Sequence, residues 1–311
     1  MKNLAILSAA LLASLVFVPA AGALAMKAGG RVDGGAKTVY TGRPYAVPIE
    51  VGPHGHIVMT VRVDNVEGRF ILDTGAGINV ITKKFAERLG HMKREDGYFT
   101  GFRATGEALR LNLYEVNDIE IGDMDLHDPV VTVLDADLGD VDGLISLTCF
   151  RNQPFTIDFA DRKMFLDTKA SLDKRAEEGK TVPVQLDDDR GISLDMFTKV
   201  SVNDRLTLQI SLDSGAGFDV YRFNAGFMKE LGVDASAAKK YYKKSSLNNK
   251  VENMFYIADL DKISLSAASS VRTGKVKTAF LNGLIYDGIT GINWLGKEIT
   301  IDIPDREMIL N

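Results

Sequence analysis

The chain has 311 residues, more than one ordinary domain holds, and its formal net charge is −5. Its 45% hydrophobic and 25% charged residues are typical of a globular protein and exclude a chain that is disordered throughout. The acidic balance gives no support to a general nucleic-acid role, so we expect no nucleic-acid partner. The single cysteine, Cys149, excludes an intrachain disulfide, and its apolar neighbours indicate a small core residue rather than a nucleophile.

Residues 1–25 have the layout of a secretory signal peptide. Lys2 precedes an apolar run from Leu4 to Val18, and the segment ends in Ala23-Leu24-Ala25, a small-residue cleavage site. We therefore expect an exported protein, periplasmic or secreted, with no membrane span after signal cleavage. The alternative is an uncleaved membrane anchor, since the apolar run approaches spanning length. Residues 26–45 are rich in glycine and basic residues, which predicts a flexible lead-in.

Strand patterns dominate the chain after residue 45. Apolar runs separated by turn residues predict hairpins, the first with its turn at 64–68. The predicted hairpin arms are 57–63 with 69–72, 156–159 with 163–166, and 300–303 with 307–310. Short helices are predicted at 83–89 and 225–231, each ended by a glycine. The fold class predicted from these patterns is mostly β.

The chain also repeats itself, with six matches in the same order at offsets between 135 and 145 residues. The clearest match relates Leu72-Asp73-Thr74-Gly75-Ala76-Gly77 to Leu212-Asp213-Ser214-Gly215-Ala216-Gly217. The repeat predicts two copies of one lobe, at 46–167 and 181–311. Residues 168–180 between them are charged and weakly apolar, which predicts a linker or a short helix.

Each copy contains an apolar strand, an Asp-Thr/Ser-Gly-Ala turn and, about 70 residues later, an Asp-Gly segment that begins at Asp142 or Asp287. This pattern resembles the retropepsin-like aspartic proteases over nearly all of residues 46–311. One such turn is a weak signal, because these tripeptides are common in turns, but two copies in register are specific. The resemblance implies two pseudo-two-fold-related retropepsin-like β-barrel lobes with a cleft between them, in a monomer.

The resemblance implies a catalytic pair, Asp73 and Asp213. Two close carboxylates share one proton, so the ionised one activates a water while the protonated one donates to the scissile carbonyl. The supporting turn residues would be Thr74 and Ser214, which bond across the lobe junction, and Gly75 and Gly215, which allow a tight turn. The expected partners are polypeptide substrates with apolar side chains beside the cut, and the reaction needs no cofactor and no metal.

Four positions depart from related patterns. Ala76 and Ala216 lack the hydroxyl that pepsin-type enzymes usually have there, and the loss of a hydrogen bond to a carboxylate raises its pKa. We therefore expect a pH optimum less acidic than that of pepsin. Ser146 stands where the family's downstream glycine is expected, and Thr290 stands at an apolar position, so we expect the fine geometry that supports both turns to differ from the family's.

A flap that covers the cleft is predicted at 97–102, continuing to Leu111, with Tyr98 as the candidate substrate contact. The alternative is an ordinary surface hairpin. The matching region of the second copy, 238–255, is basic and polar, and predicts either a second flap or a solvated loop.

The predicted activity is that of an aspartic endopeptidase. Two rival hypotheses retain the fold without turnover: a silent peptide-binding protein and a structural envelope protein. A weaker hypothesis makes residues 26–45 a short propeptide whose basic side chains lie near the active site. His54 and His56 have the spacing of a metal pair on a strand, but with few other histidines we interpret them as part of a surface turn.

Overall fold

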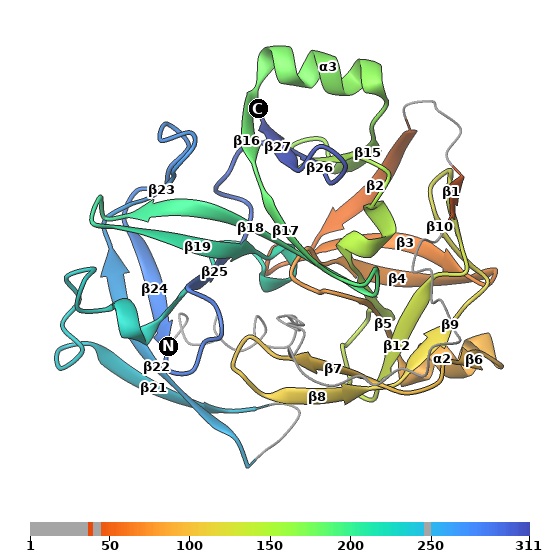
Figure 1. Ribbon diagram of the computed structural model, residues 1–311, viewed down its shortest axis with the longest axis horizontal. Helices are drawn as coiled ribbons and strands as arrows, with labels where there is room; N and C mark the ends of the chain where they lie inside the picture. Colours follow the sequence, from red (N-terminus) through yellow and green to blue (C-terminus); the bar gives the residue numbers. More distant parts are fainter. Residues whose placement is uncertain (1–36, 40–44, 246–249) are drawn as a thin grey trace.

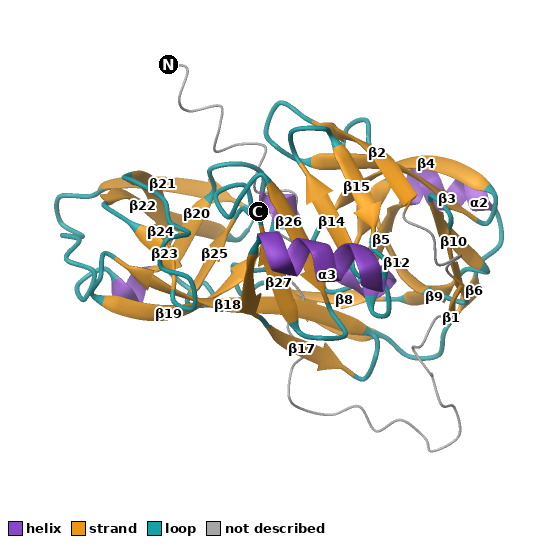
Figure 2. Cartoon of the chain, turned by 90° about the horizontal axis from the view of Figure 1, so that it is seen from above, coloured by secondary structure: helices purple, strands orange, loops and turns teal. Residues whose placement is uncertain are grey.

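The computed structural model describes residues 37–39, 45–245 and 250–311, and strands dominate its architecture (Figures 1 and 2). The predicted signal peptide, residues 1–25, and most of the predicted lead-in lie outside the described residues. Among the helices of the described residues, none is long and apolar enough to cross a membrane.

Among the described residues, the first half of the chain contributes fifteen strands, one α-helix and one 3-10 helix. The strands are β1 (Lys37–Val39), β2 (Tyr45–Val51), β3 (Ile57–Val63), β4 (Val66–Leu72), β5 (Asn79–Thr82), β6 (Lys93–Arg94), β7 (Phe99–Phe102), β8 (Ala108–Leu111), β9 (Leu113–Glu115), β10 (Asp118–Ile121), β11 (Met124–His127), β12 (Val130–Leu134), β13 (Gly143–Ile145), β14 (Phe155–Asp158) and β15 (Lys163–Leu166). The helices are α2 (Lys83–Leu89) and η1 (Leu147–Phe150).

Helix α3 (Lys169–Glu178) leads into the second half, which adds twelve strands and two 3-10 helices. The strands are β16 (Lys180–Pro183), β17 (Gln185–Asp189), β18 (Ser193–Val202), β19 (Leu206–Leu212), β20 (Tyr221–Asn224), β21 (Lys239–Lys244), β22 (Glu252–Leu260), β23 (Ile263–Leu265), β24 (Val276–Leu281), β25 (Gly288–Thr290), β26 (Glu298–Asp302) and β27 (Glu307–Leu310). The 3-10 helices are η2 (Ser214–Ala216) and η3 (Ala225–Phe227).

Strand pairing forms a 16-stranded sheet, a 9-stranded sheet and the separate hairpin β7–β8. The larger sheet follows the order β16-β27-β26-β14-β15-β2-β3-β4-β13-β5-β12-β9-β6, so it joins the end of the chain to its first half. The smaller sheet follows β17-β18-β19-β25-β20-β24-β22-β21. Among the described residues these pairings are open paths, so the mostly β fold is confirmed but the expected closed barrels are not.

Two repeated segments meet where β14 pairs antiparallel with β26. Thr156 pairs with Thr300, and their hydroxyl oxygens are 2.7 Å apart in the buried interior. The hairpin turn that follows each strand is also alike: Asp158 Oδ1 accepts from the N–H of Asp161, and Asp302 Oδ1 accepts from the N–H of Asp305. Similar sequences therefore form similar hairpins, which join the two halves through their backbones.

The core lies between the sheets and spans both halves of the chain. Fully buried phenylalanines fill it in each half, Phe70 and Phe85 in the first and Phe223 and Phe280 in the second. Burial of each such side chain contributes about 1.5–3 kcal/mol, so this shared core orients the strands that lead to the two Asp-Thr/Ser-Gly turns.

Several local predictions differ from the structure. The first hairpin turns at Asp64-Asn65 rather than at 64–68, because both residues adopt the positive φ angles (48° and 63°) of a two-residue turn. Residues 83–89 form α2 as predicted, but only Ala225–Phe227 of the second predicted helix is helical, as a 3-10 turn. Gly226 lowers helix propensity there, and the Asn224 side chain accepts from its N–H.

The segments outside the two repeats contain regular structure. Lys37–Val39 of the predicted flexible lead-in pairs with β11 as β1. Residues 168–180, predicted as a linker or a short helix, contain the helix α3, which begins at a capping box formed by Thr168 and Ser171. Arg175 on this helix binds Glu298 of β26, so α3 is attached to the larger sheet (Figure 2).

Candidate active site

Asp73 and Asp213 stand at equivalent ends of two strands. Asp73 follows β4 and its N–H donates to the carbonyl of Ile145 at 2.9 Å, while Asp213 follows β19 and donates to the carbonyl of Thr290 at 2.9 Å. Ile145 and Thr290 end β13 and β25, which run parallel to β4 and β19. Each aspartate is thus held by the strand of its own downstream Asp-Gly segment.

The two turns approach so closely that only glycine fits at their centres. A Cβ atom on Gly75 would lie 2.5 Å from Cγ of Asp213, and one on Gly215 would lie 2.3 Å from Cγ of Asp73. Each carboxyl therefore lies against the glycine of the opposite turn. The structure brings together Asp73 and Asp213, 140 positions apart in the chain, and both are 0% exposed.

Thr74 and Ser214 connect the same turns through four reciprocal hydrogen bonds. Thr74 Oγ1 donates to the carbonyl of Leu212 at 2.6 Å and accepts from the N–H of Ser214 at 3.0 Å. Ser214 Oγ donates to the carbonyl of Leu72 at 2.7 Å and accepts from the N–H of Thr74 at 2.9 Å. The predicted supporting residues all lie at this junction.

The electrostatics of the pair favour a shared proton. Burial raises the pKa of Asp73 well above its usual value, and the charge of Asp213 raises it further. Hydrogen bonds from Gly75 and Ala76 lower it in part. Ala216 donates its N–H to Asp213 Oδ1 at 2.7 Å, so the backbone supplies a donor where the alanine side chain has none. Each carboxylate thus has a backbone donor, while burial favours retention of one proton.

Asp142 and Asp287 support the strands rather than the chemistry. Asp142 Oδ2 accepts from the N–H of Arg69 on β4 at 2.9 Å, and Asp287 Oδ2 accepts from the N–H of Gln209 on β19 at 3.1 Å. Each carboxylate therefore binds the strand that carries an aspartate of the central pair, four residues before that aspartate.

The departures at Ser146 and Thr290 are accommodated by local hydrogen bonds. Asn79 Oδ1 accepts from the N–H of Ser146 at 2.9 Å and from its hydroxyl at 3.1 Å. Gly291 is the second-half counterpart of Ser146. A side chain does not fit at Gly291, because an added Cβ would lie 2.1 Å from the carbonyl oxygen of Gly217. The buried Thr290 hydroxyl accepts from Trp294 Nε1 at 3.1 Å. Each non-family residue thus has a partner that satisfies it.

The predicted flap forms the hairpin β7–β8, whose inner face packs beside the first turn. Phe99 and Leu111 join an apolar cluster with Ala76 and Ile78, the residues that follow Asp73. Tyr98 lies at the base of this hairpin, 40% exposed, with the Arg110 guanidinium 3.7 Å from its ring centre. The cluster therefore ties the hairpin to the Asp73 turn, and Tyr98 stacks with Arg110.

The end of this hairpin reaches the second half of the chain. Ala104 accepts through its carbonyl from the N–H of Ile285 at 3.1 Å and packs against Phe255 and Leu284. Arg103 Nη1 donates to Ser245 Oγ at 2.8 Å, just beyond β21. The hairpins β7–β8 and β21–β22 therefore meet, and β21 and β22 contain most of residues 238–255, where either a second flap or a solvated loop is predicted.

Comparison with known families supports this geometry. Residues 59–151 match the family model described as gag-polyprotein putative aspartyl protease. The matched segment includes the Asp73 turn, the β7–β8 hairpin and the Asp142 segment, and it ends before β14.

Among solved structures, a retropepsin-like aspartic protease from Rickettsia conorii is similar to this chain. The two are 22% identical, the match covers 43% of this chain and 94% of that chain, and the TM-score is 0.30. Among curated proteins, none matches the chain significantly.

Two buried groups near the pair did not emerge from the sequence. Asp195 on β18 is 2% exposed, and Tyr286 directly precedes Asp287. The charges of Asp195 and Asp213 both act on the Tyr286 hydroxyl, whose pKa is raised mainly by burial. A carboxylate inside the apolar run Ser193–Val202 is the same signal that singled out Asp73, but no Gly follows it to mark a turn.

The turn at His54 and His56 lies at the surface, as predicted, with His54 exposed, and its backbone also contacts the second half of the chain. The carbonyl of His54 accepts from the N–H of Phe218 at 2.9 Å, four residues after Ser214. Burial lowers the pKa of His56, and the backbone of Gly215 partly opposes that shift. The surface turn therefore also borders the second Asp-Ser-Gly turn.

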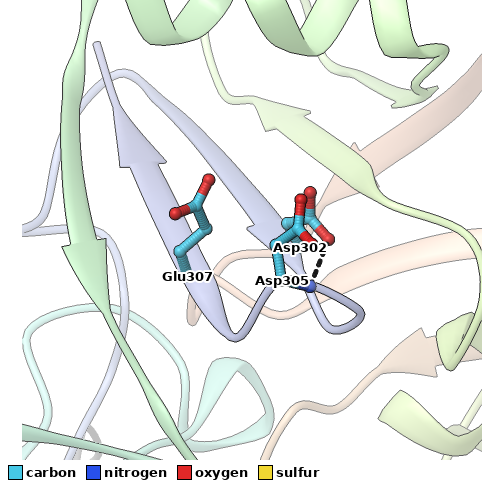
Figure 3. A group of neighbouring side chains, drawn as sticks. All are labelled: Asp302, Asp305 and Glu307. Carbon is cyan, nitrogen blue, oxygen red and sulfur yellow. Dashed lines mark hydrogen bonds between the residues drawn. The ribbon is translucent and has the colours of Figure 1, made fainter.

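A second group of carboxylates lies apart from this pair, in the hairpin β26–β27. Oxygens of Asp302, Asp305 and Glu307 lie within 4.8 Å of one another (Figure 3). Asp302 already caps the turn by accepting from the N–H of Asp305 at 3.1 Å, and the charge of Lys169 acts on both Asp302 and Glu307. These contacts describe a capped hairpin turn with a nearby cation.

Proposed function

We propose that the chain is an aspartic endopeptidase in which Asp73 and Asp213 act as the catalytic pair. The observation that carries this proposal is the close approach of the two turns, each glycine against the opposite carboxyl. The match of residues 59–151 to an aspartyl protease family supports the same reaction class. The raised pKa of Asp73 supports a pair that holds one proton between them.

In the proposed reaction, the ionised carboxylate takes a proton from a water molecule, and that water attacks the scissile carbonyl carbon. The protonated carboxyl donates to the carbonyl oxygen, so the tetrahedral intermediate forms without a covalent bond to the protein. Collapse of this intermediate breaks the C–N bond: the amine receives the proton that one carboxylate took from the water, and a hydroxyl of the intermediate returns a proton to the other carboxylate, so the pair again holds one proton. Burial favours both steps, because a water-excluded site strengthens each electrostatic contact.

The substrate would be an extended polypeptide that enters beneath the hairpin β7–β8. An extended peptide binds protein strands through backbone hydrogen bonds, while pockets on alternate sides receive its side chains. The contact of this hairpin with Ile285 means that the hairpin must move for a peptide to enter. Hairpin opening is therefore part of the proposed cycle.

We also propose that residues 46–167 and 181–311 are two lobes related by a pseudo-two-fold axis. The repeated sequence, the reciprocal Thr74–Ser214 bonds and the Thr156–Thr300 pair support this arrangement. With both turns in one chain, a monomer suffices. Export, periplasmic or secreted, is proposed from the character of residues 1–25 alone.

A mixed peptide library, incubated with the protein from about pH 3 to pH 8 and read by mass spectrometry, tests the activity. The proposal expects new termini with wild type and none with Asp213→Asn. Exposed Asp261 provides the matched control, and Asp261→Asn should cleave as wild type does. If wild type cleaves nothing while peptides still bind, the alternative of a silent peptide-binding protein replaces the enzyme.

A further inference from the structure

A row of polar groups extends from Asp213 across the second-half sheet. Phe197 pairs with Ser211 between β18 and β19, so two positions further along each strand Asp195 lies opposite Asp213. Asp187 on β17 is the direct register partner of Asp195. Residues at such positions share one face of a sheet, because side chains alternate along a strand. The three carboxylates therefore follow one another across three neighbouring strands.

This face borders a hollow of about 600 Å³. Asp187, Phe197, Gln209 and Tyr286 line it, and the rings of Phe197 and Tyr286 are 5.3 Å apart. Asp195 does not itself line the hollow, but it is buried on the same face, next to the lining residue Asp187 and on the side of the catalytic pair. Asp287 and Arg306 also line the hollow, and Asp287 is already bound to the backbone of Gln209.

The buried polar atoms at this end lack partners. Asp195 Oδ1, Ser211 Oγ and the Tyr286 hydroxyl have no hydrogen-bond partner among the described residues, although all three atoms are buried. A buried polar atom without a partner destabilises the free protein, and a ligand that supplies the partner removes this cost. Burial and the charges of Asp187 and Asp213 raise the pKa of Asp195.

We propose that this hollow, from Asp187 to Asp195, is a substrate subsite that binds a lysine or arginine side chain of the peptide beside the cut. The cation would pair with Asp195, its aliphatic stem would pack against the paired rings of Phe197 and Tyr286, and Asp187 would attract it at the entrance. The inference rests on the proposed endopeptidase function. It also changes the expected specificity: an apolar side chain is expected on only one side of the cut, and a lysine or arginine on the other.

Paired peptides test the subsite. Cleavable peptides carry either lysine or its uncharged analogue norleucine at each position near the cut, and kcat/KM is measured for both with the full chain. Wild type should prefer lysine at one position by on the order of tenfold or more, since a peptide without the cation leaves Asp195 unpaired. Asp195→Asn should bring that ratio to about one, and Asp261→Asn should preserve it. Should Asp195→Asn fail to fold, Asp187→Asn replaces it, with a severalfold fall in the ratio expected.

Two outcomes would overturn the subsite: no lysine preference in wild type, or a preference that survives in Asp195→Asn. The second outcome includes an equal fall of kcat/KM for the lysine and the norleucine peptides in Asp195→Asn. That result would make Asp195 a positioning residue for the catalytic pair instead. Binding of the same labelled peptides to Asp73→Asn, read by fluorescence anisotropy, separates this failure from that of the catalytic proposal. If the lysine peptide binds more tightly than the norleucine peptide but wild type cleaves neither, the subsite proposal stands and the endopeptidase proposal fails.

Discussion

Thr74 and Ser214 each bind the backbone of the strand that carries the other. Each hydroxyl donates to a carbonyl that directly precedes the opposite aspartate and accepts from the N–H that directly follows it. The position of each carboxyl is therefore set by a residue of the opposite repeat. This exchange explains how two turns 140 positions apart keep a fixed geometry in a buried site.

Thr74→Ala should lower the free energy of unfolding by about 2–4 kcal/mol, because it leaves the Leu212 carbonyl and the Ser214 N–H buried without a partner. Thr74→Ser retains the hydroxyl and should recover most of the loss. Urea unfolding measures both, with Thr60→Ala at an exposed strand position as the control. A loss below about 0.5 kcal/mol would show that these bonds do not hold the junction.

The pH dependence of cleavage follows from the raised pKa of Asp73. The reaction needs one proton on the pair, and activity falls as rising pH removes that proton. Because burial and then the charge of Asp213 raise this pKa above the usual 3.8, the descending limb of kcat/KM against pH should lie on the less acidic side of that value. A profile that peaks near about pH 2 and is lost by about pH 4 would contradict this.

Ala76→Ser is a second test of the pH dependence of cleavage. A hydroxyl that donates to the ionised carboxylate stabilises its charge and lowers the pKa of the pair, so the descending limb should move to lower pH by on the order of one unit. Ala86→Ser, on a helix away from the pair, is the control. No shift of the limb in Ala76→Ser would argue against carboxylate titration as its cause.

Asn79 should matter for stability even though it touches neither aspartate. Asn79→Ala removes the acceptor of the Ser146 N–H and hydroxyl, so a loss of about 1–3 kcal/mol is expected in urea unfolding. The Ser146 hydroxyl keeps Thr148 Oγ1, 2.6 Å away, as a partner, so the loss falls mainly on the buried Ser146 N–H. Equal stabilities of Asn79→Ala and wild type would contradict this account of the departure at Ser146.

Asp195 should make wild-type stability depend on pH. Its folded-state pKa lies above its unfolded value of 3.8, so the folded state binds its proton more tightly. Its presence therefore costs stability increasingly as pH rises from about 4 toward the folded pKa. Asp195→Asn should gain more free energy of unfolding over wild type at about pH 7 than at about pH 4. An equal difference at both pH values would contradict burial of an ionisable carboxyl there.

The sequence predicted the parts of the fold that depend on local pattern. Apolar runs separated by turn residues predicted the hairpin arms, and Gly90 predicted the end of α2. The Asp-Thr/Ser-Gly repeat was enough to pair Asp73 with Asp213. These signals are readable because the residues that create them lie within a few positions of one another.

What could not be predicted depends on contacts between distant segments. Asp195 is placed beside Asp213 by the register of β18 with β19, and the His54 turn is placed by its bond to Phe218. The role of Asn79 toward Ser146 likewise joins residues 67 positions apart. A local pattern contains none of this information, since each of these side chains would suit a solvated turn or strand equally well.

The most direct measurement is the cleavage rate of one library-derived peptide by wild type, Asp73→Asn and Asp213→Asn, with folding of each checked by thermal unfolding. The account predicts that each substitution lowers kcat by on the order of a thousandfold or more, because neither a lone base nor a lone acid completes the reaction. It predicts that Asp261→Asn keeps the wild-type rate. Cleavage by either folded Asp73→Asn or Asp213→Asn at more than about a tenth of the wild-type rate would contradict the paired-aspartate mechanism.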